Sequence, residues 1–262
     1  MMPEVEISKA VAPALKTLLS GFIDYAGLFP PAKVELTKAL ANYQEYRHGE
    51  YSWMLRWFVV GSNEVDNVPE PFNGCLAVLA EIDSNRAATV ESTTVIKADH
   101  PVYCEVPLNN LPMLDAVKSS GNFAKIRTGG LKPEAIPAPA DVAAFILACA
   151  DRKLPFKATA GLHHPIRSEQ PLTYEANAPR AVMYGFINVL MAAAFAWQGE
   201  RDIEPIIAEV DPKAFSFGEG ANWRNKSLTN AQIKDARDHF VHSVGSCSFE
   251  EPVQDLKALG LL

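Results

Sequence analysis

Two lysines stand in similar short motifs and are the residues of this chain best placed to do chemistry. Lys125 lies in Phe-Ala-Lys-Ile-Arg-Thr-Gly-Gly, and Lys157 lies in Pro-Phe-Lys-Ala-Thr-Ala-Gly-Leu-His-His-Pro. Each lysine sits in a short apolar run that is followed by threonine and glycine, although lysine is among the residues least often fully buried. The repeated placement predicts a functional site at the ends of two strands.

The chemistry that such a pair favours is Schiff-base formation. Burial and neighbouring cations both lower the pKa of a lysine, and a neutral amine can attack a carbonyl carbon. We therefore expect Lys125 to be a nucleophile, with Lys157 and Arg127 holding its amine neutral and binding a substrate anion. The alternative is a purely structural ion network inside a barrel, in which Glu81 and Glu105 neutralise the cations.

Several other side chains are candidates for proton transfer or for orienting the lysines. Side chains alternate between the two faces of a strand, which predicts that Glu105 points to the same side as the lysines. Glu105 or His163 would then move protons. Asp24, at the end of the first expected strand, would orient a lysine or a water, or would simply cap the next turn. Adjacent His163 and His164 should point in opposite directions, so we expect one of them to face the site.

Glycine-containing turns at three strand ends are candidates for binding the anion. Successive backbone amides in such turns can form an anion-binding concavity, although strand-to-helix turns also need glycine for purely conformational reasons. The substrate-binding residues predicted from these turns and their neighbours are Arg127, Thr128, Gly129, Gly130, Thr159, Gly161, His164 and Ser246.

These residues lie on a chain in which strand-like and helical runs alternate. The expected strands are 21–26, 54–60, 76–82, 102–106, 124–128 and 156–160, with 206–210 and 243–248 supplying the remainder. The expected helices are 34–47, 111–119, 141–150 and 181–197, while 84–100 and 212–228 show no clear pattern. This alternation predicts a parallel sheet covered by helices. A single (β/α)8 barrel domain over residues 1–262 fits best, and an open doubly wound sheet is the alternative. Arg56 and Glu81, on the second and third expected strands, would join the charged interior.

Composition limits the partners and the location that we expect for this chain. The 262 residues carry a formal net charge of −7, which disfavours nucleic acid and anionic membranes as partners. No apolar run is long enough to cross a bilayer, and the first residues lack the pattern of a secretory signal. The four cysteines are far apart, so reduced thiols in the cytoplasm are expected, with neither a metal nor a cofactor bound. The oligomeric state is left open, a homo-oligomer included.

Three patches of the chain resemble class I deoxyribose-phosphate aldolases. Ile23-Asp24-Tyr25 with the following leucine, prolines and alanine is similar to the opening of that family, Ile-Asp-His-Thr followed by Leu, Pro and Ala. Lys125-Ile-Arg-Thr-Gly is similar to its Schiff-base motif, Lys-x-x-Thr-Gly, and Lys157-Ala-Thr-Ala-Gly to its second-lysine motif, Lys-Ala-x-Gly-Gly. The resemblance implies an aldolase barrel with Lys125 as nucleophile and Lys157 as its electrostatic partner. That family carries the two lysines on strands six and seven, whereas the strands expected here number them five and six.

The strings Lys-Ile-Arg-Thr-Gly-Gly and Phe-Lys-Ala-Thr-Ala-Gly-Leu-His-His-Pro also resemble a group of bacterial proteins of unassigned function, which brings no activity with it. We therefore expect a Schiff-base, aldolase-like lyase that acts on a small anionic or phosphorylated carbonyl compound. Two alternatives remain open. One is a metal-dependent lyase or hydrolase with Glu105 and His163 or His164 as ligands, and the other is a non-catalytic barrel that binds a small anion.

Overall fold

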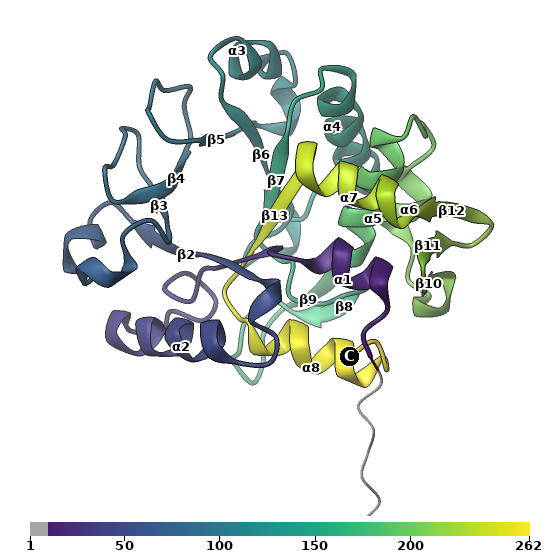
Figure 1. Cartoon of the computed structure of the whole chain (residues 1–262), viewed down its shortest axis with the longest axis horizontal. Coiled ribbons are helices and arrows are strands. Elements are labelled where there is room, and N and C mark those ends of the chain that lie inside the picture. The colour runs from purple at the N-terminus through teal and green to yellow at the C-terminus, as the bar shows by residue number, and fades with distance from the viewer. Residues whose placement is uncertain (1–9) are drawn as a thin grey trace, which may run out of the picture.

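The strands form one closed barrel. The computed structural model describes residues 10–262, in which eight parallel strands surround a common axis and helices lie outside them (Figure 1). In chain order the barrel strands are β1 (Ile23–Tyr25), β2 (Leu55–Gly61), β3 (Leu76–Leu79), β4 (Ala87–Ser92), β5 (Val102–Glu105), β6 (Phe123–Arg127), β7 (Phe156–Thr159) and β13 (Val241–Ser246). The fold is a (β/α)8 barrel, as the sequence predicts.

Each barrel strand pairs in parallel with the strands before and after it in this order, and β13 closes the barrel against β1. The register aligns Glu105 with Lys125 and Lys125 with Lys157 across three adjacent strands. Parallel strands present their carboxyl ends at one edge, where barrel enzymes place their sites. The register therefore brings the two lysines side by side near that edge.

The helical layer is uneven around the barrel. The helices are α1 (Pro13–Leu19), α2 (Leu36–His48), α3 (Met113–Ser119), α4 (Pro139–Asp151), α5 (Phe186–Trp197), α6 (Glu204–Ala208), α7 (Asn230–His239) and α8 (Glu250–Ala258). Figure 1 shows α4 to α7 gathered beside β7 and β13, while β3 and β4 on the opposite side are connected without a long helix.

Helix α5 lies at the centre of the helices that gather beside β7 and β13. Every residue from Phe186 to Ala196 is buried, which is typical of a helix that is apolar on all faces and enclosed by other elements. Its one strongly polar residue, Asn188, donates from Nδ2 to the backbone oxygens of Ile206 and Glu209, each at 2.8 Å. Asn188 also accepts from the backbone nitrogen of Arg167 at 2.9 Å, so its amide fastens α6 and a loop onto α5.

Two insertions interrupt the pattern between β7 and β13. The first is an antiparallel hairpin of β8 (Ser168–Pro171) and β9 (Arg180–Met183), which follows the carboxyl end of β7. The second is a small antiparallel sheet of β10 (Phe215–Phe217), β11 (Gly220–Trp223) and β12 (Lys226–Thr229), which packs near α1. Helix α7 starts directly after β12 with a capping box between Thr229 and Gln232.

One strand was not predicted, and two predicted elements are wrong. Strand β4 lies within 84–100, where the sequence pattern gave no strand, and it moves the lysines to the sixth and seventh barrel strands. Residues 206–210 do not form a strand, because Pro205 opens the short helix α6 and its isoleucines pack into the core. Residues 181–197 are not one helix, because β9 ends at Met183 and α5 begins at Phe186.

One helical stretch among the described residues, Pro133–Asp151, passes a test of length and composition for spanning a bilayer. Most of it is α4, whose apolar side chains Val142, Phe145, Ile146 and Cys149 are buried against the barrel and its neighbouring helices.

Candidate functional site

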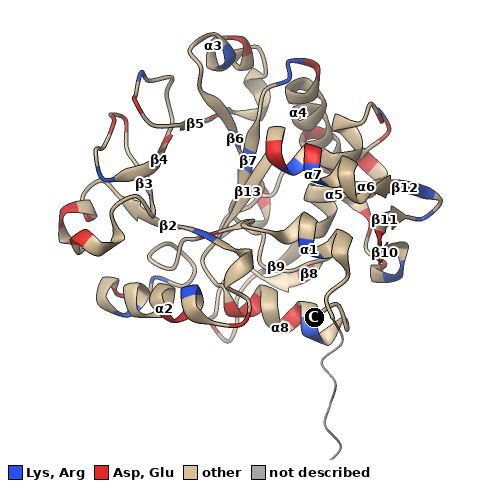
Figure 2. Ribbon diagram, in the orientation of Figure 1, with Lys and Arg blue, Asp and Glu red and all other residues tan. Residues whose placement is uncertain are grey.

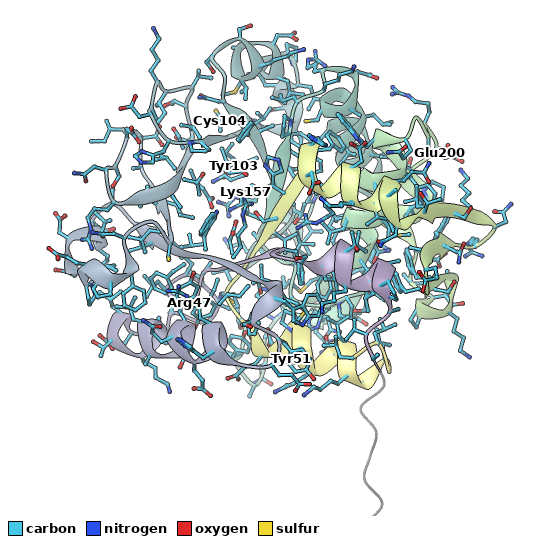
Figure 3. The ribbon with its side chains drawn as sticks, in the orientation of Figure 1. Arg47, Tyr51, Tyr103, Cys104, Lys157 and Glu200 are labelled. Atoms are coloured by element: carbon cyan, nitrogen blue, oxygen red, sulfur yellow. The ribbon has the colours of Figure 1, made fainter. Side chains whose placement is uncertain are left out.

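Lys157 is completely enclosed inside the barrel. Its Nζ lies 2.5 Å from Asp24 Oδ2 on β1 and 2.5 Å from Glu91 Oε1 on β4, so it joins strands on opposite sides of the barrel. Figure 3 shows Lys157 beside Tyr103, whose ring centre is 5.4 Å from Nζ. Burial alone would lower the pKa of Lys157, but the two carboxylates outweigh burial and raise it above its ordinary value. Lys157 is therefore held as an ammonium ion.

Lys125 shares one of those carboxylates. Its Nζ lies 3.1 Å from Glu91 Oε2 and 3.1 Å from Glu105 Oε2. Burial would raise the pKa of Glu91, but the ammonium groups of Lys157 and Lys125 lower it to about 2. A single ionised carboxylate thus fixes both amines, with one oxygen facing each lysine.

A cavity of about 350 Å³ opens onto one lysine and not the other. Lys125 and Glu91 lie at its lining, together with Arg127 and His163, whereas Lys157 does not reach it. The remaining lining residues are mainly apolar and come from the loop after β1, from β2 and β3, from the loop after β6, from the region after β7 and from the end of β13. Cavities that take small molecules are mostly apolar, with a few convergent polar groups. A molecule in this cavity would meet the amine of Lys125.

Asp24 faces the barrel interior, so the capping role is not what the structure shows. Its Oδ2 accepts from Ser243 Oγ at 2.6 Å and from Lys157, and its Oδ1 accepts from the backbone nitrogen of Trp57 at 3.3 Å. Arg56 Nη1 donates to the same Ser243 Oγ at 3.1 Å, which extends the charged interior from β2 to β13. Asp24 orients Lys157 and not Lys125.

The prediction that Glu81 joins the lysines is wrong. Strand β3 ends at Leu79, and Glu81 lies beyond it, where it accepts hydrogen bonds from Ser92, Thr93 and Thr94. These bonds lower the pKa of Glu81 to about 2, with the hydroxyl of Thr94 making the largest contribution. Glu81 therefore ties down the loop after β4 and leaves Glu91 as the carboxylate between the amines.

Arg127 and Glu105 lie at the outer edge of this network. Arg127 Nε and Nη2 are 3.3 and 3.4 Å from the two carboxylate oxygens of Glu105. Burial would raise the pKa of Glu105, but Lys125 and then Arg127 lower it below its ordinary value. The side chain of Arg127 is 55% exposed, so a ligand in the cavity can reach its guanidinium.

The two histidines after β7 both face α8 and have separate carboxylate partners. His163 Nδ1 is 3.2 Å from Glu251 Oε2, and His164 Nδ1 is 2.6 Å from Asp255 Oδ2. His163 also lines the cavity, where Cys247 Sγ lies 3.8 Å from its ring nitrogens. Burial alone would lower the pKa of His163, but its hydrogen bonds with Cys247 and Glu251 raise it to about 9. Of the pair, His163 is the one that faces the site.

The glycine turns at the strand ends serve close packing of the chain. A side chain at Gly129 would lie 3.1 Å from the oxygen of Ala160 and from Cα of Gly161, so these two turns press against each other. Thr128 Oγ1 donates to Ala160 O at 2.8 Å and fixes the same contact. Gly161 has a φ of +79°, which favours glycine.

Other predicted binding residues are placed in different ways. Gly130, Thr159 and Gly161 line the cavity, and Thr159 Oγ1 donates to Ile126 O at 3.3 Å. Ser246 Oγ donates to Ser248 O at 2.7 Å within the turn before α8.

The described residues contain no cluster of side chains that could hold a metal ion. Between residues 10 and 262, no group of three or more His, Cys, Asp or Glu side chains is placed to hold a metal ion. Glu105 pairs with lysine and arginine, while His163 and His164 pair with carboxylates of α8, so these three side chains do not converge.

Sequence reasoning missed Glu91, Ser243 and Cys247. Glu91 lies on the strand that went unrecognised, in Ala-Ala-Thr-Val-Glu-Ser. Threonine and valine beside this glutamate are typical of a strand. Two buried ammonium groups also need a carboxylate between them, which favours a glutamate on a neighbouring strand. Cys247 lines the cavity next to His163, and no sequence motif around it indicates this.

A scan against family models matches none of them with this chain, and a search of curated proteins finds no similar sequence.

Proposed function

We propose that the protein is a Schiff-base, aldolase-like lyase that acts on a small carbonyl compound bearing an anionic group. The observation that carries the proposal is the unequal placement of two neighbouring amines. Lys125 opens onto the cavity, whereas Lys157 is sealed behind it and held as a cation by two carboxylates. The placement of Lys125 thus suits a nucleophile, and the placement of Lys157 suits its electrostatic partner.

The reaction follows from these placements. Glu105 takes a proton from the Lys125 ammonium, and the neutral amine that results adds to the carbonyl carbon. Loss of water then gives an iminium ion on Lys125. In the cleavage direction, the iminium accepts the electron pair of the neighbouring carbon–carbon bond as that bond breaks, which leaves an enamine. In the condensation direction, the enamine supplies the electron pair that forms this bond. Cleavage turns the hydroxyl of the leaving fragment into a carbonyl and releases its proton, and the enamine takes up a proton at carbon to become an iminium again. Hydrolysis of that iminium returns the amine.

Proton transfer has two candidate carriers beside the nucleophile. Glu105 contacts Lys125 Nζ at 3.1 Å, so it can exchange a proton at that nitrogen. His163 lines the cavity with a pKa raised to about 9 and would act as a general acid near neutral pH. Glu91 has both oxygens engaged by the lysines and serves as a positioning residue.

Two further observations support the proposal. The lysines lie on the sixth and seventh barrel strands, which is where the aldolases with the resembling motifs carry theirs. The four cysteines are all free, which supports the cytoplasm as the location of the protein.

Borohydride trapping tests the proposal. Incubation with a panel of small aldehydes and ketones, followed by reduction and peptide mapping by mass spectrometry, should place an adduct on Lys125. The Lys125→Met variant should lose this adduct, while Lys132→Met, at an exposed loop position, should keep it. An adduct that survives in Lys125→Met, or that forms only on exposed lysines, would contradict the proposal.

A further inference from the structure

The cavity wall around Lys125 is suited to an alkyl chain. Leu172 and Met183, from the hairpin region after β7, are 3% and 7% exposed, and they line the same cavity as Phe29 and Pro31 from the loop after β1. A sugar carries a hydroxyl on almost every carbon, and against such a wall each hydroxyl would lose its hydrogen bonds to water without replacement. The wall therefore favours a substrate body made of carbon and hydrogen.

Arg127, at the rim of the cavity, is available to bind an anion. The hydrogen bonds of Arg127 to Glu105 are long and solvent-exposed, and such pairs contribute little. The guanidinium can therefore exchange Glu105 for a substrate carboxylate, which it fits with two parallel hydrogen bonds. Arg127 lies two residues beyond Lys125 on the same strand, a separation of roughly 6.6 Å along the strand. The carboxylate would thus lie close to the reacting carbonyl.

The position where barrels often bind phosphate is acidic. Phosphate sites in this fold lie at the loops after the seventh and eighth strands and at a following helix N-terminus. Here that helix is α8, whose first turn contains Glu250 and Glu251. Figure 2 shows acidic segments in red on this helix. Glu251 reaches His163 at 3.2 Å, and Ser246 spends its hydroxyl on Ser248. A phosphate dianion there would face a carboxylate instead of free donors.

From these three observations we infer that the substrate is a short oxo acid with an apolar tail. Its keto carbon would reach Lys125, its carboxylate would bind Arg127, and its alkyl chain would lie against Leu172 and Met183. The inference rests on the proposed Schiff base and narrows the anionic group to a carboxylate.

A panel of four probes separates the two properties of the substrate. α-Ketoisocaproate has both the carboxylate and the branched alkyl tail, methyl isobutyl ketone keeps the tail without the carboxylate, pyruvate keeps the carboxylate without the tail, and glyceraldehyde phosphate carries a phosphate. Lys125 adds to the carbonyl, water leaves, and borohydride delivers hydride to the iminium to fix the adduct. Labelling of Lys125 by α-ketoisocaproate should exceed that by pyruvate and by glyceraldehyde phosphate by about tenfold or more.

The Arg127→Met variant provides the matched test. It should reduce labelling by α-ketoisocaproate to about the level seen with methyl isobutyl ketone, and this reduction should be far larger than any change in labelling by the ketone, which has no carboxylate. Preferential labelling by glyceraldehyde phosphate would overturn the inference while leaving the Schiff base intact.

Absence of any adduct on Lys125 would refute the proposed function, and a binding measurement then decides the inference separately. Isocaproate, which has the tail and the carboxylate but no carbonyl, should raise the melting temperature, and Arg127→Met should abolish the rise. Stabilisation by inorganic phosphate alone, or by neither ligand, would overturn the inference.

Discussion

At the scale of single residues, Glu91 is the group on which the arrangement of the amines depends. It is the carboxylate that touches both Lys125 and Lys157, and it is almost fully buried. Removing the charge of one member of a buried ion network leaves the others unpaired, which costs several kcal/mol. The position of the nucleophile thus depends on a residue that does not itself react.

The depressed pKa of Glu91 predicts a loss of stability in acid. Because its pKa in the folded protein is about 2, below that of an unfolded glutamate, its ionised form stabilises the fold above about pH 4.5. This contribution, about 3 kcal/mol, should be lost as the pH falls from about 4.5 to 2. Urea unfolding at a series of pH values should show a shallower decline in Glu91→Gln than in the unchanged protein. Parallel declines in the two proteins would show that Glu91 is not held ionised.

His163 predicts the opposite dependence at high pH. Its pKa is raised to about 9, above the value of an unfolded histidine, so its protonated form stabilises the fold below about pH 6.5. That stabilisation should disappear as the pH rises from about 6.5 to 9, and His163→Gln should flatten this part of the stability profile. Titration of the imidazole by NMR gives a direct check, and an unshifted histidine signal would count against the ion pair with Glu251.

At the scale of elements, the attachment of α6 to α5 depends on one buried amide. Asn188→Leu would leave the oxygens of Ile206 and Glu209 without their donor, at a cost of about 1–3 kcal/mol each. We expect urea denaturation to show a loss of about 3 kcal/mol or more. Met191→Leu on the same helix keeps the side-chain volume and should cost less than about 1.5 kcal/mol. Equal effects of the two substitutions would contradict the role given to Asn188.

The elements also show what the sequence could predict and what it could not. Strands β6 and β7 were predictable because apolar residues alternate with Lys125 and Lys157 and glycines end both runs. Strand β4 was not, because its inward Thr89 and Glu91 resemble a solvated segment unless the buried lysines that they face are known. The run 206–210 looked like a strand because its isoleucines are β-branched, but Pro205 and contacts with α5 made it helical.

The same limit applies to the site. Residue types at strand ends predicted that Lys125, Lys157, Glu105 and Arg127 lie together, since alternation and parallel pairing fix their side of the sheet. Which lysine meets the cavity depends on the loop after β1 and on the hairpin of β8 and β9, whose course no local pattern specifies.

At the scale of the whole molecule, the uneven helical layer predicts uneven protection from hydrogen exchange. The residues of α5 are buried and surrounded by α4, α6 and α7, whereas the connections 80–86 and 93–101 beside β4 are mostly exposed and lack long helices. Local opening is cheapest where few buried contacts must be broken. Mass-detected exchange should be slowest in α5 and fastest in these two connections. Uniform protection across the barrel would contradict this expectation.

The link from Asp24 on the first strand to Ser243 on the last has a consequence for the way the protein is made. During synthesis, β1 to β7 leave the ribosome well before β13, and until it arrives the sheet has two open edges that can pair with other chains. Asp24 lacks Ser243 over the same interval, so Lys157 has an incompletely held partner. A nascent chain that stops before Val241 should accordingly need a chaperone and lack the reactive amine arrangement, however long it is given to fold.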